Sequence, residues 1–195
     1  IKDILSNTVV NTIVLDVKTD NGHLLYDSEI LEVEELKNER IKYDKQTLKS
    51  FKEEFNIYLI GRVVAFQDPI FSRTYPESAI TDIKTGRPYS QDSQYFLDPS
   101  DSTSREYILN VALEACLLGF DEIQFDYIRY PDTSYQGLVF DEESNSENRT
   151  KNINSFLQDA TNLLHDSGCL ASADIFGYVL NAKNDNGIGQ YLETI

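Results

Sequence analysis

Acidic side chains stand near the ends of short apolar segments of this chain. Asp126 falls in the segment EIQFDYI, and Asp174 falls in the segment CLASADIF. Paired carboxylates suit the cleavage of a glycosidic bond, in which one protonates the leaving oxygen and the other acts as nucleophile or as base on water. Asp126 and Asp174 are therefore the candidate catalytic residues.

Further polar residues accompany this pair. Asp16, Lys18 and Arg62 share the polar strand faces with the two carboxylates, and Arg129 follows Asp126 closely in FDYIRYPD. Tyrosines beside the strand ends could stack on sugar rings, although aromatic residues near strands are more often core. The residues expected to orient substrate or tune the carboxylates are Asp16, Lys18, Arg62, Arg129, Tyr130 and Tyr178.

The same charges also allow a purely structural interpretation. An unpaired buried charge costs several kcal/mol, so charges inside a barrel must pair, for example Arg62 with Asp126. Arg129 could equally form a surface ion pair. For the set as a whole we favour the functional interpretation, because barrel enzymes carry their catalytic residues at the carboxyl ends of parallel strands.

Metal and cofactor sites have little support in the sequence. His23 and His165 have no Cys or His neighbour, so we expect no transition-metal site and no cofactor. A hard metal ion such as Mg²⁺ prefers oxygen ligands, and Asp16, Asp126 and Asp174 could supply them. That arrangement would instead favour a magnesium-assisted lyase or aldolase.

Alternating helices and strands must position these residues. Periodicity predicts strands over 11–17, 57–66, 122–128 and 169–176, and helices over 1–8, 44–55, 104–118, 149–166 and from Ile188 onward. This alternation implies parallel βαβ units, which form either an open doubly wound sheet or a closed barrel. No dinucleotide or phosphate-loop motif follows any strand, which argues against the open nucleotide-binding sheet. The long segments all follow strands, as insertions on the active face of a β/α barrel do: 18–43, 67–101, 129–148 and 177–187.

Alternation within each strand separates an apolar face from a polar one. We expect the apolar face to pack under the helices. Its members are Ile13, Leu15, Val17, Leu59, Val63, Ala65, Ile123, Phe125, Ala171, Ala173 and Ile175.

Composition places the chain among globular proteins and excludes two classes of partner. The 195 residues, 41% of them hydrophobic, suffice for a single domain over 1–195. A net charge of −16 repels nucleic acid, and no run of apolar residues is long enough to span a membrane.

The chain starts with Ile and lacks Met, so we expect it to be part of a longer protein. Cys116 and Cys169 lack metal-type spacing and are expected to be buried; a disulfide between them stays open.

The stretch GFDEIQFDYIRYP at 119–131 resembles the signature of a bacterial family known as putative glycoside hydrolases. The stretches at 11–28, 61–69 and 172–178 resemble the same family. This resemblance implies a (β/α)8 TIM barrel related to the α-amylase-like glycosidases, of which the chain covers roughly strands two to five. The remaining strands are expected from the parent chain. In those relatives the Asp ending the fourth strand is the nucleophile and the acid ending the fifth strand donates the proton, roles that fall here on Asp126 and Asp174.

The expected function is hydrolysis of O-glycosidic bonds in a polysaccharide, outside the cell or at the cell envelope. The alternative is a non-catalytic carbohydrate-binding or envelope module on the same scaffold. It is favoured by one departure from the family pattern, since amylase-like enzymes usually carry Glu where this chain has Asp174.

Overall fold

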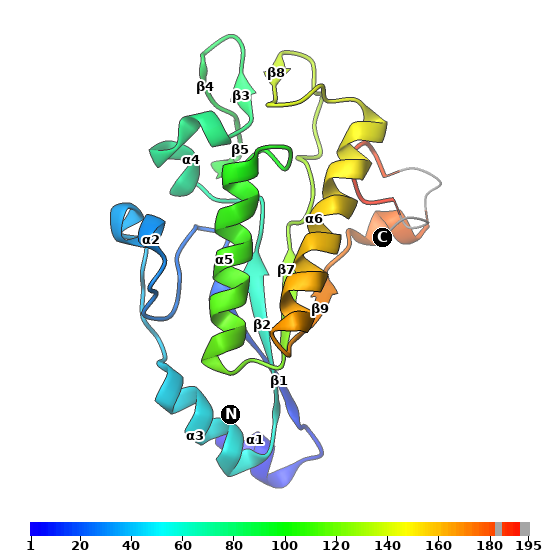
Figure 1. Cartoon of the computed structure of the whole chain (residues 1–195). Helices are drawn as coiled ribbons and strands as arrows, with labels where there is room; N and C mark the ends of the chain where they lie inside the picture. The colour runs from blue at the N-terminus through cyan, green and yellow to red at the C-terminus, as the bar shows by residue number, and fades with distance from the viewer. Residues whose placement is uncertain (182–184, 192–195) are drawn as a thin grey trace.

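Four parallel strands form the central sheet of the molecule (Figure 1). The computed structural model describes residues 1–181 and 185–191. The strands follow one another in the order β1-β2-β7-β9, with bounds β1 Thr12–Lys18, β2 Tyr58–Val64, β7 Glu122–Asp126 and β9 Leu170–Ala173. The α/β class with a parallel sheet is confirmed. The closed barrel stays a prediction, because the described strands form an open sheet with β1 and β9 at its edges.

Helices precede or connect these strands close to the positions that periodicity predicted. Their bounds are α1 Lys2–Asn7, α3 Lys45–Phe55, α5 Ser102–Leu118 and α6 Ser146–Asp166. Side chains cap three of them: Asp44 accepts from the Thr47 amide, Asp101 from Ser104 and Asn145 from Asn148, which satisfies otherwise unpaired N–H groups. Gly119 ends α5 with φ 115°, a conformation that glycine adopts without steric cost.

The core lies between the sheet and the helices α5 and α6, which run side by side over one face (Figure 1). Leu59, Val63, Ile123 and Phe125 are fully buried there, as the predicted apolar face requires. Phe156 of α6 packs edge-on against Phe125, with ring centroids 5.5 Å apart. Each such buried side chain contributes about 1.5–3 kcal/mol of hydrophobic stabilisation.

The opposite face of the sheet is partly open. Val14 is 49% exposed, and the side chains of Asp16 and Arg62 are 43% and 27% exposed. This is the face on which the sequence placed its polar residues.

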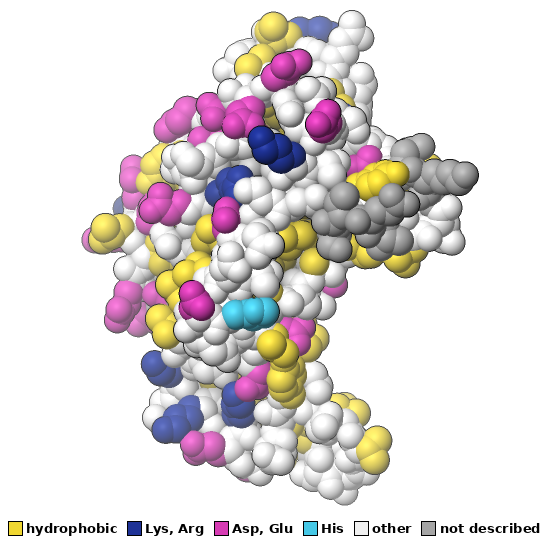
Figure 2. Space-filling model, turned by 45° about the vertical axis from the view of Figure 1, so that its right-hand side comes forward, with side chains coloured by type: hydrophobic (Ala, Val, Ile, Leu, Met, Phe, Trp, Pro, Cys, Tyr) yellow, Lys and Arg dark blue, Asp and Glu magenta, His cyan; other side chains and the backbone are white. Residues whose placement is uncertain are grey.

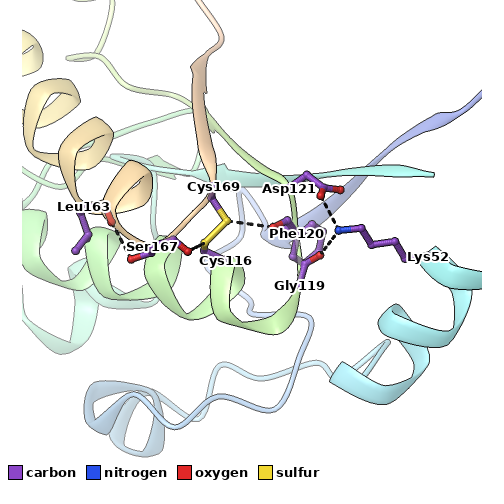
Figure 3. Close-up of a disulfide and its surroundings, with 8 residues drawn as sticks. All are labelled: Lys52, Cys116, Gly119, Phe120, Asp121, Leu163, Ser167 and Cys169. Atoms are coloured by element: carbon purple, nitrogen blue, oxygen red, sulfur yellow. Dashed lines mark hydrogen bonds and ion pairs between the residues drawn. A yellow bond between two sulfur atoms is a disulfide. The ribbon is translucent and has the colours of Figure 1, made fainter. Parts of the chain in front are cut away.

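The two cysteines are buried and form a disulfide between the end of α5 and the start of β9 (Figure 3). The turn beside the disulfide contains Asp121, whose Oδ1 accepts a hydrogen bond from Lys52 Nζ of α3 at 2.6 Å. Asp121 also accepts the Leu59 amide of β2 at 2.9 Å. One carboxylate thus ties α3 and β2 to the turn that enters β7.

The long connections after β2 and β7 contain short elements that periodicity did not predict. They form a layer beyond the carboxyl ends of the strands, in which β3 pairs with both β4 and β8 (Figure 1). The elements in these two connections are α4 Phe71–Thr74, η1 Pro76–Ser78, β3 Thr81–Asp82, β4 Arg87–Pro88, β5 Ser90–Gln91, β6 Gln94–Tyr95 and β8 Leu138–Val139. Two further short helices that periodicity did not predict are α2 Leu31–Leu36, which follows β1, and η2 Gly177–Leu180, which follows β9.

Several predicted boundaries are wrong. The second and third strands end at Val64 and Asp126 rather than at residues 66 and 128. The fourth strand stops at Ala173 rather than continuing to residue 176. The helix expected from Ile188 is absent over 188–191, and its remainder lies outside the described residues. Of the helices in the described part of the chain, none combines the length and the apolarity that crossing a bilayer would take.

Candidate active site

Arg62 of β2 connects Asp16 of β1 with Asp126 at the end of β7. Its Nη1 donates to Asp16 Oδ1 at 2.8 Å, and its Nε donates to Asp126 Oδ2 at 3.0 Å. Its Nη2 donates to the same oxygen of Asp126. Parallel pairing places Asp16 opposite Arg62 and sets Asp126 at the carboxyl end of β7, within reach of the guanidinium. The predicted pairing of Arg62 with Asp126 is confirmed.

The second oxygen of Asp126 is held by the backbone. Its Oδ1 accepts the amide of Tyr127 at 2.7 Å. This geometry uses a left-handed backbone at Tyr127, with φ 51°, which is unusual for a bulky residue. The Tyr127 carbonyl accepts the Phe66 amide at 3.2 Å, so the segment that continues β2 helps to hold this conformation. Both carboxylate oxygens of Asp126 therefore have fixed donors.

Asp174 lies just past the end of β9, beside Asp126 in the same cavity. Its amide donates to the Phe125 carbonyl at 2.8 Å, which continues the β7–β9 pairing by one residue. Burial raises the pKa of Asp174, and the charge of Asp126 raises it further, whereas Arg62 lowers it. The surroundings of Asp174 thus favour its protonated form.

A cavity of about 370 Å³ contains both carboxylates. Arg129 lies in its wall between two aromatic rings, 5.1 Å from the centroid of Tyr127 and 5.5 Å from that of Phe176. Phe176 is 43% exposed, so part of its surface is free for a ligand. The lining residues are Arg62, Asp126, Tyr127, Arg129, Asp174, Ile175, Phe176, Gly177 and Gln190.

Two of the predicted substrate-binding residues do not reach this cavity. Lys18 is fully buried and pairs with Asp68 at 3.0 Å, because a bulge between Asp16 and Lys18 shifts the register and turns the lysine away from Asp16. Tyr130 is 1% exposed, and its hydroxyl accepts from Asn152 at 3.1 Å. Neither side chain has an exposed polar atom for substrate, so both expectations are corrected to structural roles.

The other expected residues fall nearer to the cavity. Arg62 and Arg129 line the cavity. Asp16 does not line it but accepts a hydrogen bond from the lining residue Arg62. Tyr178 is 45% exposed in η2, the helix that begins at the cavity residue Gly177, but it is not part of the lining.

Gln190 is a lining residue that sequence reasoning missed. Its Oε1 accepts the amide of Phe176 at 2.7 Å, and its Nε2 donates to the carbonyls of Ile128 and Asp174 at 3.4 Å. These contacts fix the chain that follows both catalytic candidates. No motif marks Gln190, since it lies in a segment for which periodicity predicted a helix.

The described part of the chain contains no cluster of side chains arranged to bind a metal ion. No group of three or more His, Cys, Asp and Glu side chains there could hold a metal ion. Asp16 and Asp126, two of the three ligands considered for magnesium, instead share Arg62.

Fold and cavity together define an α/β protein that presents carboxylates at the carboxyl end of a parallel sheet. The chain belongs to the family described as "Putative glycosyl hydrolase domain", whose model matches residues 1–195. The family resemblance seen in the sequence is thereby confirmed. A comparison with curated proteins found no significant match.

Solved structures share the fold. A hypothetical protein from Ruminiclostridium thermocellum is 37% identical over 90% of this chain and 88% of that one, with a TM-score of 0.77. Ega3 from Aspergillus fumigatus, solved with galactosamine, is 13% identical over 90% and 63% of the chains, with a TM-score of 0.50. The α-galactosidase TtGalA from Thermus thermophilus is 12% identical over 88% and 33%, with a TM-score of 0.55. The chain thus spans less than two thirds of the last two proteins.

Proposed function

We propose that this chain carries the active site of a glycoside hydrolase that cleaves O-glycosidic bonds of a polysaccharide. The observation that carries the proposal is the unequal surroundings of two carboxyl groups in one cavity. Asp126 accepts hydrogen bonds from Arg62 and Tyr127, whereas burial and the nearby charge of Asp126 raise the pKa of Asp174. Such a difference assigns separate acid and nucleophile roles to two otherwise identical side chains.

In the proposed reaction Asp174 starts protonated and gives its proton to the glycosidic oxygen as the bond to the leaving sugar breaks. Asp126 attacks the anomeric carbon and forms a covalent glycosyl ester. Asp174, now ionised, takes a proton from water, and the resulting hydroxide equivalent cleaves the ester. Two displacements at one carbon retain the anomeric configuration.

The neighbours of the pair suit substrate binding. Arg62 fixes the orientation of the Asp126 carboxylate, and Asp16 fixes Arg62 in turn. Arg129 and the exposed ring of Phe176 offer a donor and an apolar face to a sugar. We assign these residues to positioning rather than to bond breaking.

The proposal includes a closed (β/α)8 barrel in the parent protein, in which this chain supplies roughly strands two to five. Partly open polar residues on the second sheet face, such as Asp16, would then lie inside the barrel. The four strands run parallel in sequence order, as consecutive barrel strands do. The parent chain would provide the other strands.

We also propose that the protein works outside the cell or at the cell envelope. The disulfide between Cys116 and Cys169 supports this location, because disulfides persist mainly in oxidising compartments.

Hydrolysis by the full-length parent protein tests the reaction. Asp126→Asn should reduce turnover of a polysaccharide, drawn from a panel of bacterial and plant polymers, by at least about a thousandfold, because the amide cannot form the glycosyl ester. The variant should stay folded by circular dichroism, since Arg62 keeps Asp16 as a partner. Released reducing ends report the rate.

Asp159→Asn is the matched control, because Asp159 also pairs with an arginine, Arg105 at 2.7 Å, but on the helices. It should hydrolyse at the wild-type rate. Equal loss in both variants, or a misfolded Asp126→Asn, would attribute the effect to ion-pair stability. Binding of a polysaccharide without turnover by the wild type would favour the non-catalytic module.

A further inference from the structure

A second cavity, of about 550 Å³, lies in the long connection between β2 and α5. The β3 and β4 strands of this connection stand beyond the carboxyl end of the sheet, the end that carries Asp126 and Asp174 (Figure 1). The cavity is lined by Arg73, Thr85, Arg87, Pro88, Ser90 and Tyr95. It shares no residue with the candidate active site.

The polar side chains of this lining are hydrogen-bond donors without a carboxylate among them. Two residues with guanidinium groups and three with hydroxyls line the space, in a chain whose net charge is −16. Acidic side chains are spread over the surface of the molecule shown in Figure 2. A lining with two arginines and no carboxylate is therefore a local exception to the net negative charge of the protein.

Both arginines keep donors available. Arg73 stacks on the ring of Tyr95, 4.6 Å from its centroid, which occupies the face of the guanidinium and leaves N–H groups along its edge. Within the described part of the chain, neither Arg73 nor Arg87 forms an ion pair, whereas Arg62 and Arg105 do. Hydrogen bonding with Arg73 first, and then with Ser90, lowers the pKa of Tyr95, so these lining residues are in contact with one another.

We propose that this cavity binds a single oxyanion group, a carboxylate or a sulfate or phosphate ester, carried by a carbohydrate. Planar guanidinium groups match such oxygens with paired hydrogen bonds, and Pro88 and the ring of Tyr95 supply apolar surface for the sugar. The field of the whole protein disfavours densely charged polymers, so the ligand carries isolated charges on an otherwise neutral glycan. The sugar part of this inference rests on the proposed function.

Binding of small charged sugars tests the inference without requiring hydrolysis. Galacturonate and galactose 6-sulfate should shift the NMR signals of the Nε–H groups of Arg73 and Arg87, and galactose at the same concentration should not. Arg73→Ala and Arg87→Ala should each weaken binding about tenfold or more, because each removes charge-assisted hydrogen bonds. Asp126→Asn should bind as the wild type does, which separates this outcome from any failure of the hydrolase proposal.

Lys84→Ala is the matched control, since it removes one positive charge from the same hairpin but lies outside the lining. It should change the affinity less than about twofold. The proposal is overturned if neither charged sugar binds, if galactose binds equally well, or if Lys84→Ala weakens binding as much as Arg87→Ala. Inorganic sulfate that binds as tightly as galactose 6-sulfate would also overturn it, because the sugar would then contribute nothing.

Discussion

At the scale of single residues, Asp174 is the group whose proton affinity defines the proposed chemistry. Its pKa is raised by burial first and by the charge of Asp126 second, and Arg62 opposes both. A raised pKa keeps a carboxyl group protonated to higher pH. The proposed acid step should therefore slow as the pH rises through the pKa of Asp174.

The two charged neighbours should move this pKa in opposite directions. Asp126→Asn removes a negative charge and should lower the pKa of Asp174, whereas Arg62→Gln removes a positive charge and should raise it. Carboxyl ¹³C chemical shifts followed against pH measure both effects without any substrate. Asp159→Asn, remote from the cavity, should leave the titration in place. An unchanged pKa in Asp126→Asn would mean that the two carboxyl groups are not electrostatically coupled.

At the scale of elements, the buried pair of Lys18 and Asp68 connects the end of β1 to the segment after β2. Lys18 also donates to the Val64 carbonyl at 2.8 Å, and Asp68 accepts the amides of Ile70 and Phe71 at the start of α4. Both side chains of the pair are completely buried. The pair thus fixes where the long connection leaves the sheet.

Lys18→Met should lower the free energy of unfolding by about 3–5 kcal/mol, because it leaves the Asp68 carboxylate buried without its counter-charge. Urea denaturation measures the loss. Lys2→Met is the matched control, since Lys2 pairs with Glu54 at the surface, where ion pairs contribute only about 0–1 kcal/mol. Equal effects of the two substitutions would contradict a structural role for the buried pair.

Prediction from sequence succeeded for the central sheet and the helices that cover it, and it was less complete for the connections and the site. Hydrophobic periodicity placed the four parallel strands and the helices α3, α5 and α6, because their apolar faces are built from local repeats. It failed for Lys18, since strict alternation cannot anticipate a bulge that shifts the register. Gln190 escaped notice because its contacts are made across 14 or more residues, by a segment in which periodicity predicted a helix that the structure does not contain over 188–191.

At the scale of the whole molecule, one disulfide closes a large part of the chain. Cys116 and Cys169 are separated by 53 residues, a span that contains β7 and α6. Replacing both with Ser should lower the free energy of unfolding by about 4 kcal/mol, because a closed loop of that length restricts the unfolded chain. Denaturation with and without a reducing agent measures it.

The double variant should be insensitive to the reducing agent, and the wild type should lose the same stability when reduced. Wild-type protein whose unfolding is unaffected by reduction would contradict the cross-link.

The disulfide lies where β9 begins, whereas Asp126 and Asp174 lie where β7 and β9 finish. The disulfide and the two candidate catalytic carboxylates thus lie at opposite ends of the same two strands. A label or an added domain attached near the disulfide would leave the approach to the carboxylates free. Changes in the loops around the carboxylates would leave the disulfide intact. Substitutions around the candidate site can therefore change its shape and charge without breaking the covalent link at the other end of the strands.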